Sequence, residues 1–494
     1  MNDRERSRLS RRRVLWQAAA ASGLGAIFKM TESPVAAQAR GGARGGAAGQ
    51  GGGPPGGGFG GMRGGGVTYG PINKLSSPSD LRITDLRAVT VAANFDYPII
   101  RMDTNQGVYG LGEVRDGGFK GSALGLKPLL IGRNPLDITG ILQTIRPYAG
   151  HGRQGGGYSA IDICLHDING KVFGVPVWRL LGDKKTSRIR VYCDTNGTSD
   201  PKKYGERMLA RKKMGFTFFK MDVTTNWIRV KPDYLNDYGV PTDKGLAYSG
   251  ELITAVKDAI GWDAPLGVDT SNIMLTKSVK DGIRVCRAWE KYQLAFVEDL
   301  FGSANFANWQ GFKEIKAATS CKLLTGENGF GLEEGFKNLI DNRAVDLIHP
   351  DPGTSGACLE TKRIADYADK QGILTVLHMA GSPVGSLASA HMACTLNNFV
   401  AQECHAVDFL SWWQQLVTGV PQPFIDKGYI TVPDAPGLGI ELNEAVVKEH
   451  LREPGYFDPT PEYDKVRFVG RGTGGPWPHF NVDGVWVNER TSDY

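Results

Sequence analysis

Cysteine pairs, long apolar runs and basic stripes are all missing from this sequence. Its seven cysteines are scattered, odd in number and free of any CxxC pair, so we expect reduced core cysteines rather than a disulfide framework. No segment outside the N-terminus approaches the roughly 20 apolar residues that cross a bilayer, so stable membrane insertion is not expected. No run of basic residues is interleaved with aromatics, which argues against nucleic acid as a partner.

The composition is that of a globular protein with a large core. Of the 494 residues, 41% are hydrophobic and 22% are charged, and the length exceeds that of one typical domain. The net charge of +5 is small for this size and owes much to the N-terminus. Six arginines lie within the first 13 residues, before any segment that is expected to fold: Arg4, Arg6, Arg8, Arg11, Arg12 and Arg13.

Residues 1–39 are typical of a twin-arginine export signal. The pattern SRRRVL (10–15) is followed by an apolar stretch over 16–28, and Ala37-Gln38-Ala39 supplies small residues for cleavage. Because the apolar stretch is too short to span a bilayer comfortably, we expect cleavage and a periplasmic mature protein. The alternative is an arginine-rich disordered tail. Residues 40–80 are rich in glycine and predict a flexible, disordered linker.

The folded chain is expected to begin with an α+β unit over residues 81–187. Alternating β-branched and polar residues over 82–113, with a turn at DTNQG, predict an antiparallel meander. Residues 124–181 are predicted to be mostly helical, and strands followed by helices indicate a unit of their own. The loops at 115–118 and 150–158 are candidate specificity elements.

Three acidic residues with equal spacing are the most informative feature of the chain. Asp269, Glu298 and Glu327 each end a short apolar run, and both gaps are 29 residues. A strand with its crossover helix takes about 30 residues, so this spacing fits successive βα units of a parallel barrel, whose strand ends converge on one mouth. Three converging carboxylates repel one another unless positive charge lies between them, and a hard divalent cation with oxygen ligands is the simplest candidate.

The same rhythm continues on both sides of these acids. Further strand-like runs end at Asp351, His378 and Glu403, in steps of 24, 27 and 25 residues. Upstream, the run FTFFKMD supplies Lys220 and Asp222, and RIRVYCDT (188–195) is predicted to be the first strand. Eight strand-like runs therefore fall between residues 188 and 403, which favours a (β/α) barrel over 188–405.

In their order and spacing these motifs resemble the mandelate racemase and muconate lactonising enzyme family of the enolase superfamily. The resemblance covers about residues 82–450 and includes SAIDICLHDINGKVFGVPVWRLLG (159–182) and PDAPGLGIELNE (433–444). It implies an α/β fold: a modified TIM barrel of the (β/α)7β type, capped by the N-terminal α+β domain. It also implies that the C-terminal segment, 406–494, returns to pack on the capping domain, although the tail after Arg452 is left unexplained.

The resemblance also implies a metal site and a catalytic pair. Asp269, Glu298 and Glu327 would hold Mg²⁺, which leaves about three octahedral positions for water or substrate. His378 would be the base that removes the proton next to a substrate carboxylate, because imidazole titrates near neutrality. Asp351 would hold that imidazole in one tautomer.

The remaining strand-end residues are expected to contact the substrate. Lys220 would be the electrostatic partner of the substrate carboxylate, and Glu403 would hydrogen-bond on the same side. Asp222 stands where members of this group often carry a second lysine, which acts as a base on one face of the substrate. A carboxylate does not simply replace that lysine, so Asp222 is expected either to pair with Lys220 or to touch a substrate hydroxyl.

The leading hypothesis is therefore a magnesium-dependent lyase that removes water from a sugar acid and yields a 2-keto-3-deoxy acid. His378 would act as the base and then, as its conjugate acid, would assist loss of the 3-hydroxyl. The second hypothesis is a racemase or epimerase of a 2-hydroxy acid through the same enediolate. The third is a non-catalytic periplasmic sugar-acid binding protein, which the intact base and ligands argue against. We also expect a homo-oligomer.

Overall fold

The computed structural model describes residues 78–270, 278–405, 410–468, 480–482 and 485–487. The predicted export signal (1–39) lies outside these residues, as does the glycine-rich segment except for its last three residues, which form η1 (Pro78–Asp80). Among the described helices, none combines the length and the apolar character that a membrane crossing requires.

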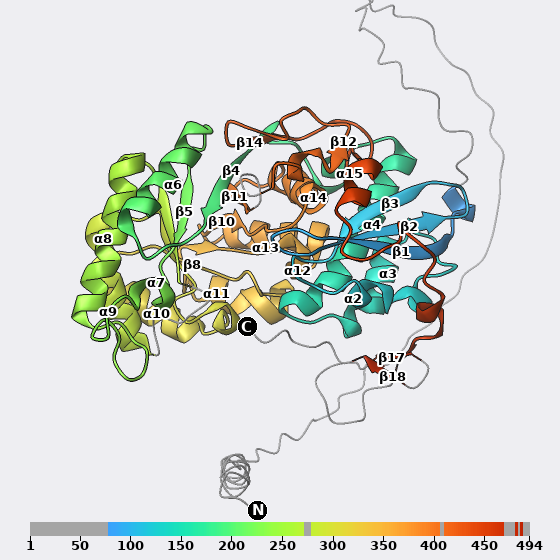
Figure 1. The fold of residues 1–494 in the computed structure, drawn as a ribbon. Coiled ribbons are helices and arrows are strands. Elements are labelled where there is room, and N and C mark those ends of the chain that lie inside the picture. Colours follow the sequence, from blue (N-terminus) through green and yellow to red (C-terminus); the bar gives the residue numbers. More distant parts are fainter. Residues whose placement is uncertain (1–77, 271–277, 406–409, 469–479, 483–484, 488–494) are drawn as a thin grey trace, which may run out of the picture. The chain divides into compact units, whose positions relative to one another are not determined.

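Eight parallel strands form a closed barrel, which confirms the predicted fold class (Figure 1). Each strand pairs with the next in the chain, and the last closes on the first through Gln402–Val191 and Cys404–Cys193. The strands are β4 (Arg188–Thr195), β5 (Phe219–Asp222), β6 (Leu266–Asp269), β7 (Phe296–Glu298), β8 (Leu323–Thr325), β9 (Leu347–Ile348), β10 (Leu374–Leu377) and β11 (Phe399–Cys404).

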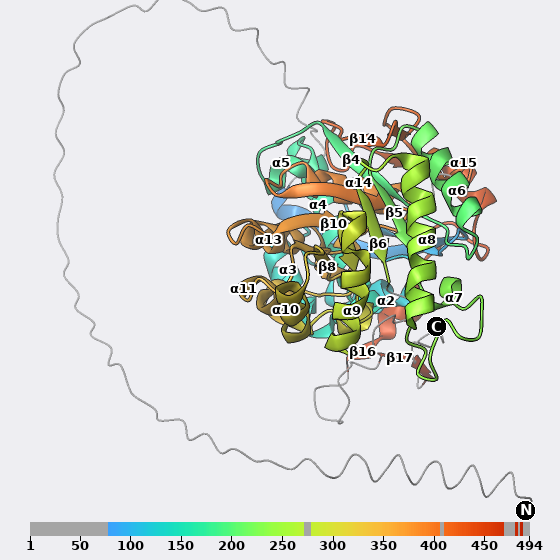
Figure 2. The same cartoon turned by 90° about the vertical axis from the view of Figure 1, so that its left-hand side faces the viewer.

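Helices follow the first seven strands and surround the barrel (Figure 2). They are α6 (Pro201–Lys213), α7 (Thr225–Ile228), α8 (Asp243–Ile260), α9 (Val279–Trp289), α10 (Trp309–Ala318), α11 (Lys337–Asp341), α12 (Pro352–Ser355), α13 (Ala357–Asp369) and α14 (Pro383–Ala393). Polar side chains begin several of them: Asp200, Thr242 and Asn308 each accept a backbone N–H of the first turn. In the described part of the chain β11 has no helix of its own, which gives the (β/α)7β pattern.

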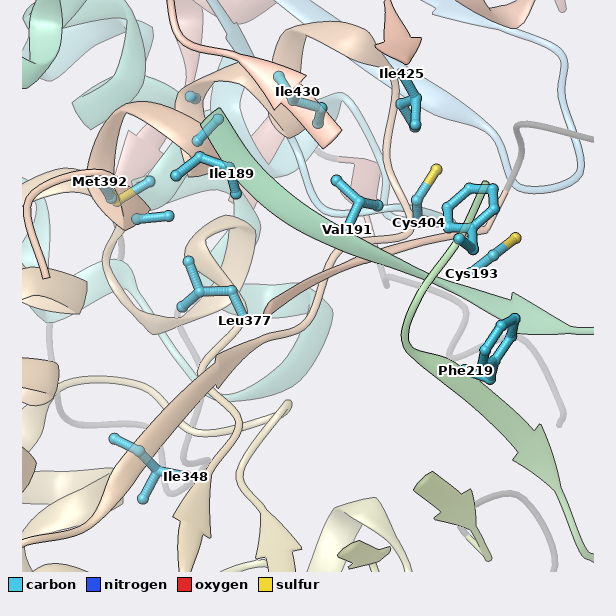
Figure 3. Packing of buried hydrophobic residues seen from close by; sticks show 14 of the residues in the cluster. Ile189, Val191, Cys193, Phe219, Ile348, Leu377, Met392, Cys404, Ile425 and Ile430 are labelled. Carbon is cyan, nitrogen blue, oxygen red and sulfur yellow. The ribbon is translucent and has the colours of Figure 1, made fainter. Parts of the chain in front are cut away.

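Side chains alternate along the barrel strands and form two apolar layers. On β4, Ile189, Val191 and Cys193 pack between the barrel and its surroundings, whereas Tyr192 points into the barrel. Figure 3 shows the outer layer, in which residues of the C-terminal segment, Ile425 and Ile430, pack near those of β4. The inner layer takes one residue from each of six strands and Phe218, which directly precedes β5: Tyr192, Phe218, Phe296, Leu324, Leu347, Val376 and Ala401. The barrel interior is thus a packed core rather than a pore.

The capping domain combines an antiparallel sheet with helices, as predicted. The sheet is formed by β1 (Ile83–Val91), β2 (Tyr97–Thr104) and β3 (Tyr109–Glu113), and the helices are α2 (Gly121–Leu124), α3 (Ile138–Ile145), α4 (Gly156–Phe173) and α5 (Val177–Leu181). Helix α4 lies directly on β3, where a Cβ at Gly110 or Gly112 would come within 2.2 Å of a backbone oxygen of α4. Only glycine therefore permits this close approach.

The C-terminal segment returns to both the barrel and the capping domain. It contains β12 (Val417–Thr418), β13 (Ile425–Asp426), β14 (Tyr429–Thr431), β15 (Glu441–Leu442) and α15 (Glu444–Glu449), and β14 pairs antiparallel with β4. Backbone hydrogen bonds then join the chain to β1: Ala92 N donates to His450 O (2.7 Å) and Arg452 N to Thr90 O (2.8 Å). Beyond them lie η9 (Pro461–Lys465), β16 (Arg467–Phe468), β17 (Phe480–Val482) and β18 (Val485–Val487).

Candidate active site

A ring of ionisable residues follows the inner apolar layer at the carboxyl ends of the strands. Residues two apart on a strand point to the same side, so the residue two positions beyond each inner apolar residue also faces the barrel axis. At this spacing the chain carries Asp194, Lys220, Glu298, His349, His378 and Glu403, and Asp269 occupies the same position beyond Gly267 of β6. This end of a (β/α) barrel is where active sites are built.

The three equally spaced acids come together in this ring. Lys220 Nζ lies 3.1 Å from Asp269 Oδ2 and 3.3 Å from Glu298 Oε2. Carboxylate oxygens of Glu298, Asp299 and Glu327 lie within 4.8 Å of one another. Glu298 is fully buried, and this burial together with the charge of Asp269 raises the pKa of its carboxyl well above the usual range.

Glu327 reaches the mouth by a turn of the backbone. Strict alternation from the inward-pointing Leu324 would direct Gly326 inward and Glu327 outward. Strand β8 instead ends at Thr325, and Gly326 adopts a φ of +126°, which a residue with a side chain rarely adopts. Glu327 Oε2 then lies 3.3 Å from His378 Nε2. The equal sequence spacing of the acids therefore does not reflect equal positions on their strands.

This donor set fits a divalent cation. Lys220 is shared among Asp269, Glu298 and Glu403 and so offsets only part of their charge. The raised pKa of Glu298 indicates that the cluster is short of positive charge. Carboxylate oxygens are the ligands that Mg²⁺ prefers, so Asp269, Glu298 and Glu327 could hold it. Asp299 also lies in this group, and Thr325 Oγ1 donates to its Oδ1 at 2.5 Å.

His378 and Asp351 form a buried pair beside the acids. His378 Nδ1 lies 2.5 Å from Asp351 Oδ2, and its Nε2 is left facing Glu327. Burial favours the neutral imidazole, but the charges of Asp351 and Glu327 raise the pKa of His378 to about 9. A cation held by Glu327 would offset one of these charges and lower that pKa.

The capping domain contributes Arg115 to the same site. Its buried guanidinium has Nε 3.4 Å from Asp351 Oδ2 and Nη2 3.4 Å from Glu327 Oε1, and Nη1 donates to Glu327 O at 2.9 Å. The neighbouring Asp116 accepts from Arg153 of the second candidate loop (3.4 Å). A pocket lined by both domains includes Arg115, Asp116 and Asp351. Both loops that the sequence suggested as specificity elements thus contain residues at this junction.

Glu403 is the centre of a second charged cluster. Its buried carboxylate lies 2.6 Å from Lys220 Nζ, 3.2 Å from His405 Nε2 and 3.6 Å from His349 Nε2. Although burial opposes ionisation, Lys220 and His405 hold the pKa of Glu403 well below its usual range. His349 differs, because burial lowers its pKa to about 3 and keeps it neutral, with Nδ1 3.0 Å from Glu298 Oε1.

Asp222 ends β5 but belongs to neither ion-pair cluster described above. Burial and the neighbouring charges of Asp194 and Asp269 raise the pKa of its carboxyl well above the usual range. The ion pairs of Lys220 are with Asp269, Glu298 and Glu403. Of the two expectations for Asp222, a contact with a substrate hydroxyl suits this position better than a pair with Lys220.

Four residues of the mouth were missed by the sequence analysis. These are Asp194, Asp299, His349 and His405. The strand period carried a signal for three of them, since His349 and Asp351 are two apart, as are Glu403 and His405, and Asp194 follows Tyr192 by the same step. Arg115 lies in one of the loops suggested as specificity elements, but the sequence did not indicate its ion pairs with Asp351 and Glu327, which lie more than 200 residues away.

Family comparisons cover nearly all of the folded chain. Residues 80–182 match the mandelate racemase/muconate lactonizing enzyme N-terminal domain, and residues 203–446 match the enolase C-terminal domain-like family. A D-xylonate dehydratase of Haloferax volcanii is 31% identical over 383 residues, which cover 76% of this chain and 90% of that protein. A D-galactonate dehydratase family member of Pantoea ananatis is 29% identical, and the match covers 76% of this chain and 96% of that protein.

Solved structures show the same similarity. An enolase from Pantoea ananatis with bound D-gluconate and magnesium superposes with a TM-score of 0.65 at 26% identity, covering 76% of this chain and 96% of that one. A mandelate racemase/muconate lactonizing enzyme-like protein from Rubrobacter xylanophilus gives a TM-score of 0.68 at 27% identity, with coverages of 76% and 99%.

Proposed function

Because this chain belongs to the mandelate racemase/muconate lactonizing enzyme family of the enolase superfamily, we propose that it is a magnesium-dependent dehydratase of sugar acids. The observation that carries the proposal is the His378–Asp351 pair, whose free Nε2 lies 3.3 Å from Glu327 of the acid cluster. A base beside a cluster suited to a cation is what proton removal next to a carboxylate requires. The dehydratases among its relatives, and the neighbour with bound D-gluconate and magnesium, support the substrate class.

The cation site would be provided by Asp269, Glu298 and Glu327. Bound Mg²⁺ would supply positive charge that offsets the second negative charge on the substrate carboxylate when its α-proton leaves. Lys220, at the floor of the same site, adds a fixed ammonium on the carboxylate side of the substrate. Asp222, the last residue of β5, would contact a substrate hydroxyl.

Proton removal is assigned to His378. Asp351 holds the Nδ1–H, so the lone pair of the neutral ring is on Nε2, which faces the mouth. Arg115 Nε lies 3.4 Å from the Asp351 oxygen that also contacts His378, Oδ2, and so restricts the orientation of the pair. Loss of the 3-hydroxyl as water then gives an enol, which tautomerises to a 2-keto-3-deoxy acid.

Dehydration is preferred to epimerisation because inversion at C2 requires a second base on the opposite face. The position that commonly carries that base as lysine is Asp222 here. Lys220 itself is held by three carboxylates, and Glu298, Glu403 and Asp269 raise its pKa well above the usual range although burial opposes this. An ammonium held so firmly is a poor base.

The proposal is tested with a panel of mono- and diacid sugars in the presence of Mg²⁺ and D₂O. We expect at least one sugar acid to give a 2-keto acid, detected with semicarbazide, and the His378→Asn variant to give none. Recovered substrate that is inverted and deuterated at C2, without any 2-keto acid, would contradict dehydration and favour the epimerase. Tight binding without turnover or exchange would favour the binding protein.

A further inference from the structure

A second histidine–aspartate pair lies in the mouth of the barrel. His405 directly follows β11, and its Nδ1 lies 3.4 Å from Oδ2 of Asp194 on β4. The pair depends on barrel closure, because β11 and β4 are the last and first strands and pair through Cys404–Cys193. Asp194 stands next to Cys193 on one strand and His405 next to Cys404 on the other, so closure brings them together.

His405 stands beside His378 rather than opposite it. The two ring centroids are 6.1 Å apart, and both imidazoles border Glu403, at 3.2 Å from His405 Nε2 and 3.9 Å from His378 Nε2. This separation is about twice the hydrogen-bond reach of a catalytic group, so the two rings can act on neighbouring carbons of one substrate. Both rings come from adjacent strands, so they approach a bound substrate from the same side.

His405 is also the more accessible of the two histidines. Its side chain is 16% exposed, against 6% for His378, while Glu403 beneath them is fully buried. The ring of Phe95, from the capping domain, lies edge-on to His405 at 5.8 Å. The imidazole is therefore held by Asp194 at Nδ1, while Nε2 lies on the side of Glu403, which His378 also borders.

The surroundings favour the protonated form of His405. The charged and titratable groups that face it are Asp194 of β4, Glu403 of β11, Lys220 of β5, Asp116 of the capping domain, and His378. Burial and Lys220 disfavour the imidazolium, but Asp194 and Glu403 outweigh them and raise the pKa of His405 to about 9. At neutral pH the ring can thus donate a proton.

We propose that His405, held by Asp194, is the general acid that protonates the departing 3-hydroxyl, while His378 removes the proton from C2. The assignment rests on the dehydration proposed above. It gives the roles of base and acid, both expected of His378 from the sequence, to two different residues. It implies a syn elimination, because both rings act from one side.

With these roles, the protons and electrons of the dehydration balance. The C2–H bond breaks and its proton goes to His378, while the electron pair moves into the carboxylate group as an enediolate. When that pair returns to form the C2–C3 double bond, the C3–O bond breaks and the hydroxyl takes a proton from His405 to leave as water. The enol then loses its hydroxyl proton and gains one at C3, so no oxidant or reductant is consumed.

The test compares two leaving groups in the full-length enzyme with Mg²⁺. The substrates are the sugar acid that the wild type dehydrates and its 3-deoxy-3-fluoro analogue, because fluoride departs with its electron pair and needs no proton. We expect His405→Asn to lower 2-keto acid formation from the hydroxy substrate by roughly 100-fold or more. Fluoride release, measured with an ion-selective electrode, and exchange of the C2 proton in D₂O should stay within a few-fold of the wild type.

Two further variants sharpen this comparison. Asp194→Asn removes the charge that favours the imidazolium, so the loss of activity at alkaline pH should begin at a lower pH with the hydroxy substrate, but not with the fluoro analogue. His450→Asn is the matched control, because His450 stacks on Trp412 at 3.9 Å and takes no part in the mouth. It should leave both reactions unchanged.

Three results would overturn the assignment. If His405→Asn eliminated the 3-hydroxyl at the wild-type rate, the general acid would be another group. An equal fall with both leaving groups would show that His405 supports binding or positions Glu403 instead. A wild-type enzyme that exchanges the C2 proton but never eliminates water would refute the proposed dehydration itself, and this assignment with it.

Discussion

At the scale of single residues, buried ionisable side chains gather in the mouth of the barrel. Glu298 and Glu403 are both fully buried, yet burial and Asp269 raise the pKa of the first, whereas Lys220 and His405 lower that of the second against the effect of burial. The two carboxyls therefore differ through their neighbours rather than their depth. A cation bound beside Glu298 would lower its pKa, whereas Glu403 already has close cationic partners in Lys220 and His405.

If Glu298 is a metal ligand, the Glu298→Gln variant should lose Mg²⁺ affinity but not its fold. The variant should keep its fold by circular dichroism, because the side chains are nearly the same size, but should lose affinity for Mg²⁺ measured by calorimetry. We expect a loss of more than about tenfold, since even outer partners of metal ligands are worth about 10- to 100-fold. Glu333→Gln, at an exposed glutamate, is the control. Normal turnover in excess chelator would contradict the metal role of all three acids.

The catalytic pair predicts different outcomes at its two members. His378→Asn should abolish 2-keto acid formation and C2 proton exchange while Mg²⁺ still binds, because the acids are untouched. Asp351→Asn should keep the fold but lower the rate by roughly 100-fold or more, since the imidazole would no longer be held in the required tautomer. Both are measured by steady-state assay and by mass spectrometry of substrate in D₂O. Wild-type exchange by His378→Asn would place the base elsewhere, with Lys220 as the next candidate.

At the scale of secondary-structure elements, β3 of the capping domain is joined to α14 of the barrel by Glu113. Its Oε1 accepts from Ser382 N (2.8 Å) and its Oε2 from Gly385 N (2.9 Å), so the carboxylate caps the N-terminus of the helix. Arg115, two residues later, enters the active site. The same short segment therefore fixes the cap on the barrel and supplies a residue of the mouth.

This joint predicts a pH dependence of stability. Burial raises the pKa of Glu113 from 4.5 to about 7, so the folded state holds this proton more tightly than the unfolded chain does. The stabilisation that this proton gives to the folded state is fully present below pH 4.5 and is lost as the pH rises through about 7. The change corresponds to about 3 kcal/mol at 1.36 kcal/mol per pH unit. Between pH 4.5 and 8, the free energy of unfolding in urea should therefore fall by about that much more in the wild type than in Glu113→Gln. If the free energy of unfolding changed with pH in the same way in the wild type and in Glu113→Gln, this prediction would be wrong.

At the scale of the whole molecule, the described fold is preceded by 77 residues that carry the predicted export signal and linker. We propose that the protein is exported by the twin-arginine route. This route carries folded proteins, so the enzyme could reach the periplasm with its metal already bound.

The export proposal predicts that replacing Arg11 and Arg12 with lysine leaves unprocessed protein in the cytoplasm. Arg11 and Arg12 are the twin arginines of the export pattern, and lysine keeps their charge while changing the side chain. Fractionation followed by immunoblotting measures both location and processing, and the matched control replaces Arg4 and Arg6, which lie outside the pattern. Unchanged processing of the Arg11 and Arg12 variant would contradict the twin-arginine route.

The sequence by itself determined the fold class and most of the barrel mouth. Residues such as Asp269, Glu298 and His378 end apolar runs at nearly regular intervals, and parallel βα units place such ends together whatever the details of packing. The local pattern was sufficient because each of these residues is positioned by its own strand. The antiparallel meander was likewise recognisable from the alternation of β-branched and polar residues.

Only the tertiary structure decided the contacts that cross from one unit to another. Arg115 reaches Asp351 because the capping domain lies on the mouth, and His405 meets Asp194 because the last strand closes on the first. Glu327 needs the backbone turn at Gly326 to face His378. Such contacts join residues far apart in sequence. The docking of the capping domain and the backbone turn at Gly326 leave no periodic trace in the chain, and the strand period alone does not say which side chains meet across the closed barrel.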